Sequence, residues 1–203
     1  MSERKGNKRR TLRRGRAGQL PTAGLLRRIA AEMLPFYKVV GRSRGFASAW
    51  SRAVVRADLD GMQKLLGAVA PSLARRGMGT NGIGYFISFP APGSYYSCGI
   101  TIPPGKVQFH FNPGIHRLMA RALIPFFGTI AYGPTYARAL ARAIAKNDGR
   151  TAARLVRSRV KTNALKSVRI EDGGLVLNFK YPSSKYVYSL LLFREFNELG
   201  SSG

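Results

Sequence analysis

The chain has few of the residues that build metal sites, disulfides and catalytic centres. Its 203 residues include one cysteine, two histidines and nine carboxylates. A lone Cys98 forms no disulfide within one chain and no thiolate metal site, and we expect it to be a half-buried strand residue. His110 and His116 have no acidic cluster beside them and make a poor metal site. We therefore predict no metal, no cofactor and no enzymatic activity.

Long hydrophobic runs are also missing. The longest apolar run, residues 122–131, contains Pro125 and is ten residues long, whereas a spanning helix needs about 20. The start of the chain lacks the apolar stretch of a secretory signal. These absences predict no transmembrane segment, no secretory signal and a location in the cytoplasm or with nucleic acid in a nucleoid or virion.

A glycine-rich segment resembles a dinucleotide-binding fingerprint only in its spacing. Gly77, Gly79 and Gly82 are the three spaced glycines, but the fingerprint requires a strand before them and a helix after them. The surrounding pattern has the opposite order, because helical spacing precedes the glycines and alternation follows. We predict a linker turn.

What the chain does contain is an internal repeat. A shift of 90 pairs residues 24–106 with residues 114–196, and 17 of the 83 positions are identical. A long internal period points to a duplicated structural unit. We interpret the sequence as a disordered basic tail, residues 1–20, followed by a first α+β repeat, residues 21–110, and a second, residues 111–203, whose helices are more basic.

Both copies have a helical half. Apolar residues at spacings of three and four predict helices in the first copy and at equivalent places in the second: residues 25–40, 46–56 and from 59 onward, then 115–130, 136–146 and from 149 onward. Asp58 and Asp148 precede the third helix of each copy. Aspartate is a favoured N-cap, so we predict capping roles and not catalytic ones.

A strand half follows in each copy. Alternation between turn-rich loops predicts strands at residues 85–89, 95–102 and 107–111, then 168–170, 175–181 and 186–193. The fold class is therefore α+β, a tandem duplication of a unit of about 90 residues with three helices and then a β-hairpin. The order resembles the winged helix. The alternative is one pseudo-twofold domain with a shared antiparallel sheet.

Charge gives the strongest functional indication. Against nine acidic residues stand 34 basic ones, a net charge of +25, which calls for a polyanionic partner. Eight basic residues in the tail are expected to follow a phosphate backbone without base preference: Arg4, Lys5, Lys8, Arg9, Arg10, Arg13, Arg14 and Arg16.

The second copy adds basic residues at helical spacing. Arg150, Arg157 and Lys161 replace Asp60, Gly67 and Pro71 of the first copy. Like charges on one helix face destabilise an isolated helix and become favourable opposite phosphates. We predict that nucleic acid contacts these helices and the second hairpin loop, through Arg138, Arg142, Lys146, Arg150, Arg154, Arg157, Lys161, Lys180 and Lys185.

The sequence thus favours a non-catalytic protein that binds DNA or RNA. Two alternatives use the same charge. One is a structural shell or packaging subunit of the capsid or nucleocapsid kind, in which a basic arm faces enclosed nucleic acid and the body self-assembles. The other is a peripheral binder of anionic membrane or cell-wall polymer, with residues 118–130 partly inserted. Composition alone does not separate the three.

Overall fold

The structure is a computed structural model that describes residues 20–195. The eight basic residues assigned to the tail lie outside these residues. Within them the secondary structure alternates as expected, with helices first and strands second in each half of the chain. The predicted α+β class is confirmed by this content.

Seven helices form in the described part of the chain. Six of them agree closely with the periodic segments of the sequence, and the short α5 was not predicted: α2 Ala23–Arg42, α3 Arg44–Arg56, α4 Leu59–Val69, α5 Pro71–Ala74, α6 Pro113–Tyr132, α7 Pro134–Ala145 and α8 Gly149–Arg159. Both aspartates are N-caps, as predicted. The Asp58 carboxylate accepts the Gly61 N–H at 2.8 Å, and Asp148 accepts the Thr151 N–H at 3.0 Å. Each satisfies an N–H group that the first helical turn leaves unpaired.

All described strands join one antiparallel sheet in the order β1-β2-β3-β6-β5-β4. The strands are β1 Gly77–Thr80, β2 Gly84–Ala91, β3 Ser94–Thr101, β4 Leu165–Glu171, β5 Gly174–Phe179 and β6 Tyr188–Glu195. The central pair, β3 and β6, comes from the two halves of the chain. A shared antiparallel sheet, the alternative architecture, therefore describes the strands, and the hairpins do not project as separate wings.

Two local predictions are wrong. The glycine segment expected to be a linker turn forms the edge strand β1, in which the Thr80 hydroxyl donates to the Val54 carbonyl at 3.1 Å. Residues 107–111, expected to be a strand, have no regular structure. Phe109 has a φ of 48°, and this left-handed conformation interrupts an extended run. The alternating apolar residues of this segment therefore mark a loop.

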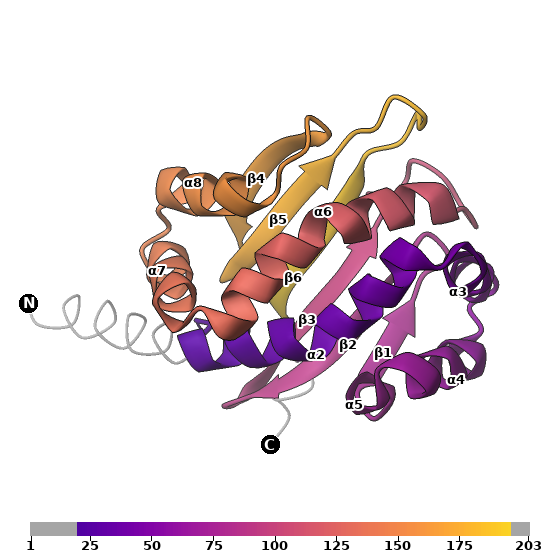
Figure 1. The fold of residues 1–203 in the computed structure, drawn as a ribbon, viewed down its shortest axis with the longest axis horizontal. Helices are drawn as coiled ribbons and strands as arrows, with labels where there is room; N and C mark the ends of the chain where they lie inside the picture. The colour runs from indigo at the N-terminus through magenta and orange to yellow at the C-terminus, as the bar shows by residue number, and fades with distance from the viewer. Residues whose placement is uncertain (1–19, 196–203) are drawn as a thin grey trace, which may run out of the picture.

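The core lies between the sheet and two long helices. Helices α2 and α6 run side by side across one face of the sheet (Figure 1). They are antiparallel, since Arg27 Nε donates to the Ala131 carbonyl at 3.1 Å and Arg121 Nε donates to the Gly41 carbonyl at 2.8 Å. Every second strand residue is buried under them: Tyr85, Ile87, Phe89, Tyr96, Cys98, Ile100, Leu175, Leu177, Phe179, Tyr188, Leu190 and Leu192.

Two core residues are more buried than the sequence indicated. Cys98 is fully buried, and burial raises the pKa of its thiol to about 12, so it is not a nucleophile. His116 is also fully buried, because α6 is covered by both the sheet and α2 (Figure 1). Its Nε2 lies 2.9 Å from the Tyr85 hydroxyl, and burial lowers its pKa to about 3. The imidazole is therefore neutral in the folded protein.

The buried histidine makes stability depend on pH. Below pH 6.5 the unfolded chain protonates His116 while the folded chain does not until about pH 3. As the pH falls from 6.5 to about 3, this group alone should lower the free energy of unfolding by about 1.4 kcal/mol per pH unit. Replacing both hydrogen-bonded partners, His116→Leu with Tyr85→Phe, should remove that part of the slope in urea denaturation at pH 7, 5 and 4. If the unfolding free energy of the double variant depends on pH as strongly as that of wild type, a group other than His116 takes up the proton.

Candidate nucleic-acid interface

The predicted contact helices α7 and α8 form one end of the molecule (Figure 1). Residues 134–166 contain nine basic residues and one acidic residue, Asp148, whereas the equivalent residues 44–76 contain six and two. Two rows follow from the helical spacing. The α7 row consists of Arg138, Arg142 and Lys146, and the α8 row of Arg150, Arg154, Arg157 and Lys161. The helices are shorter than the spacing predicted, because Lys146 is the C-cap of α7 and Lys161 lies in the loop after α8. Every member of both rows is exposed.

Most of these side chains have no partner in the part of the chain that the structure describes. Arg142, Lys146, Arg154 and Lys161 form no hydrogen bond or ion pair with residues 20–195, and Arg138 donates only to the Thr135 hydroxyl at 3.1 Å. Arg150 lies near Asp148, whose pKa is lowered by the hydrogen bonds from Thr151 and, to a smaller extent, by Arg150 itself. The rows therefore present unneutralised positive charge to solvent.

Arg157 has a structural role that its spacing did not reveal. Its guanidinium donates to the Leu165 carbonyl at 3.2 Å and to the Lys166 carbonyl at 3.1 Å. These carbonyls lie at a register shift in the edge strand β4, where the regular ladder leaves backbone groups unpaired. The α8 row therefore has three members available for a ligand, and the fourth fastens α8 to the sheet.

Two further basic residues, which the helical spacing did not indicate, lie in the same region. Arg159 lies with its guanidinium carbon 5.9 Å from the centre of the Tyr136 ring, and Tyr136 in turn donates to the Leu155 carbonyl at 2.7 Å. Lys166 Nζ donates to the Asn163 carbonyl at 3.0 Å. Neither residue continues the spacing of a row, which is why the periodicity did not select them. Both add to the positive potential at this end of the molecule.

The two lysines of the second hairpin loop differ in their surroundings. Lys180 is half-buried, and its ammonium donates to the Ser184 carbonyl within the loop. Lys185 is exposed, with Nζ 5.1 Å from the centre of the Tyr186 ring. In the first hairpin, Tyr95 is 44% exposed and Tyr96 only 1%. Lys185 and Tyr95 are thus the accessible members of this group.

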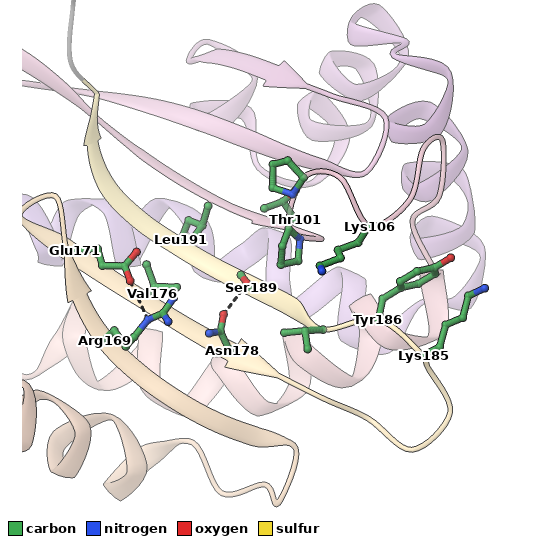
Figure 2. A pocket seen from close by; sticks show the side chains of 13 residues that line it. Thr101, Lys106, Arg169, Glu171, Val176, Asn178, Lys185, Tyr186, Ser189 and Leu191 are labelled. Carbon is green, nitrogen blue, oxygen red and sulfur yellow. Dashed lines mark hydrogen bonds and ion pairs between the residues drawn. The ribbon is translucent and has the colours of Figure 1, made fainter.

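The face of the sheet opposite α2 and α6 contains a hollow of about 720 Å³. Its floor includes Thr101 of β3, Asn178 of β5, and Ser189 and Leu191 of β6, and loop residues Lys106 and Lys185 stand at its rim. Figure 2 shows Lys106, Lys185 and Tyr186 toward one end and the Arg169–Glu171 ion pair, 2.8 Å between Nε and Oε1, toward the other. We call this cavity the sheet hollow. Of its lining residues, only Lys185 was predicted from the sequence to contact nucleic acid.

Neither a metal site nor a membrane helix emerges from residues 20–195. These residues hold no group of three or more histidine, cysteine or carboxylate side chains placed to bind a metal ion. The helices among them are too short or too polar to cross a bilayer. Searches of protein-family models, curated proteins and solved structures found no match for the chain.

The different contributions of Arg157 and Arg154 to stability can be measured. Arg157→Ala should lower the free energy of unfolding by about 1 kcal/mol, because two edge-strand carbonyls lose a charged donor. Arg154→Ala, on the same helix and without a partner in the described chain, should change it by less than about 0.5 kcal/mol. Urea denaturation of the two variants gives the comparison. Equal effects would mean that the Arg157 bonds contribute nothing to stability.

Proposed function

We propose that the protein is a non-catalytic nucleic-acid-binding protein that contacts phosphates through α7 and α8. The observation that carries the proposal is the density of unneutralised charge in residues 134–166, nine basic residues against one acidic residue. Such charge destabilises the folded chain unless a polyanion neutralises it. Phosphates do so while releasing condensed counterions, which makes the binding favourable and strongly dependent on salt.

We expect the contacts at α7 and α8 to position the nucleic acid without recognising its base sequence. The six members of the two rows other than Arg157 are exposed, long and flexible cations, and phosphate contacts carry no base information by themselves. The residues proposed to act here are Arg138, Arg142, Lys146, Arg150, Arg154 and Lys161. The basic tail would add affinity of the same kind. A packaging role remains compatible with this chemistry, whereas partial membrane insertion of residues 118–130 conflicts with the burial of Met119, Leu123, Phe126 and Phe127 in the core.

We also infer that the two halves derive from one duplicated unit. The pairing Gly77↔Ser88 of β1 and β2 has its counterpart in Ser167↔Asn178 of β4 and β5, both members shifted by the same 90 residues as the sequence repeat. The capping aspartates Asp58 and Asp148 share this offset. On this interpretation the α7 and α8 rows are a feature of one copy on a scaffold common to both.

The test is a triple variant of the α8 row in the full chain. Arg150→Ala, Arg154→Ala and Lys161→Ala together should weaken binding to a DNA or RNA duplex. They should also reduce the slope of log affinity against log salt by about 2.7, at roughly 0.9 per phosphate contact. Fluorescence anisotropy over a salt series measures both quantities. Arg157 stays unchanged so that the attachment of α8 is preserved.

A matched control removes the same charge elsewhere. Lys38, Arg52 and Lys64 are exposed on α2, α3 and α4, and their triple alanine variant should reduce the slope by less than about 1, since it removes no phosphate contact. Equal slopes for the two triple variants would contradict an interface on α8. A wild-type protein that binds neither DNA nor RNA at low salt would overturn the proposed function as a whole.

A further inference from the structure

A row of polar side chains crosses four strands at the sheet hollow. Asn178 Nδ2 donates to the Ser167 hydroxyl at 3.0 Å, and the Ser189 hydroxyl donates to Asn178 Oδ1 at 2.7 Å. Thr101 of β3 lies opposite Ser189 and extends the row toward the middle of the sheet. Val176 and Leu191, which face each other across β5 and β6, form an apolar strip beside it. The floor is thus polar along one line and apolar along the next.

The other half of the sheet has a comparable place, and there the position above the polar pair is filled. Ser88 and Ser97 face each other across β2 and β3, as Asn178 and Ser189 do across β5 and β6. Both serine hydroxyls donate to one carboxylate oxygen of Glu195, the Ser88 bond being 2.5 Å long. In the second half the corresponding pair faces the hollow. This face of the sheet therefore already holds one anionic acceptor, the Glu195 carboxylate.

The charges around the hollow favour an anion from outside. Lys106 and Lys185 stand at one end, both exposed, and form no ion pair within residues 20–195. At the other end Glu171 is paired with Arg169 at 2.8 Å, so its carboxylate is largely compensated. The resulting field attracts a negatively charged group to the Lys106 end. A second copy of this chain, with a net charge of +25, is disfavoured as an occupant.

We propose that the sheet hollow binds a single-stranded segment of nucleic acid, with phosphates beside Lys106 and Lys185 and a base on the strip of Val176 and Leu191. This inference rests on the proposed function and adds a preference to it. A cavity of about 720 Å³ is of the size that holds one small planar ligand with its polar edge on a few fixed groups. Unpaired bases can be turned out to reach such groups, whereas the bases of a duplex are stacked inside it.

The test compares strand types in the full chain. Lys106→Gln with Lys185→Gln should weaken binding to twelve-nucleotide (dT) and (rU) single strands about tenfold. The salt slope for these strands should fall by about 1.4, at roughly 0.7 per phosphate on a single strand. Binding to a duplex should change less than twofold. Lys38→Gln with Lys64→Gln removes the same charge from α2 and α4 and should affect single strands and duplex equally.

A second measurement does not depend on any variant. Single strands containing 4-thiouridine, cross-linked to the wild-type protein, should attach to residues that line the hollow, Tyr186 and Leu191 among them, as read by mass spectrometry of the peptides. Cross-links confined to α7 and α8 would overturn the inference, as would equal effects of the two lysine pairs on single strands. So would loss of binding to phosphatidylglycerol vesicles on Lys106→Gln with Lys185→Gln without a change in single-strand affinity.

The two proposals fail in different ways. If wild type binds duplex through the α8 row while the hollow variant behaves like its matched control, the inference fails and the proposed function stands. If wild type binds neither single strands nor duplex, both fail. If single-strand binding depends on the two hollow lysines and the α8 triple variant is without effect, the hollow is the interface and the assignment to α8 is wrong.

Discussion

The pairing of β3 with β6 is the constraint on which the rest of the structure depends. These strands come from opposite halves of the chain and are paired from Tyr95↔Glu195 to Thr101↔Ser189. Their pairing makes one six-stranded sheet from two sets of three and fixes the antiparallel helices α2 and α6 over the junction. The inner side chains of both strands, Cys98 and Leu190 among them, are fully buried under these helices. Separating the halves would expose both the central ladder and the apolar layer above it.

The same geometry separates the two places where positive charge can act. Helices α7 and α8 lie at one end of the layer formed by α2 and α6, and the sheet hollow lies on the opposite face of the sheet. Rigid strands therefore support the hollow, whereas the α7 and α8 rows consist of long cations on helices and at the helix ends. The hollow can select a ligand by shape and hydrogen bonding. The α7 and α8 rows supply electrostatic attraction that tolerates many ligands.

The sequence predicted six of the seven helices, the capping aspartates and five of the six strands of the described chain at the right places, because these depend on local spacing. It did not predict how strands from the two halves pair, because that is decided by long-range packing under α2 and α6. Residues 107–111 alternate as a strand does, and only the left-handed backbone at Phe109 excludes one. His116 shows a related limit. One histidine among apolar residues gives no sign of its burial until the faces of α6 are known.

The site was less predictable than the fold, for a physical reason. Helical spacing places Arg150, Arg154 and Arg157 on one face, but only the structure reveals that Arg157 is held by the carbonyls of β4. The hollow has no local signature, because Lys106, Asn178 and Ser189 come from distant segments and meet through the register of β3, β6 and β5. The two halves of the sheet differ at this place. In the first half Glu195 accepts from both serine hydroxyls, whereas in the second half the polar pair faces the hollow and lysines stand at its rim.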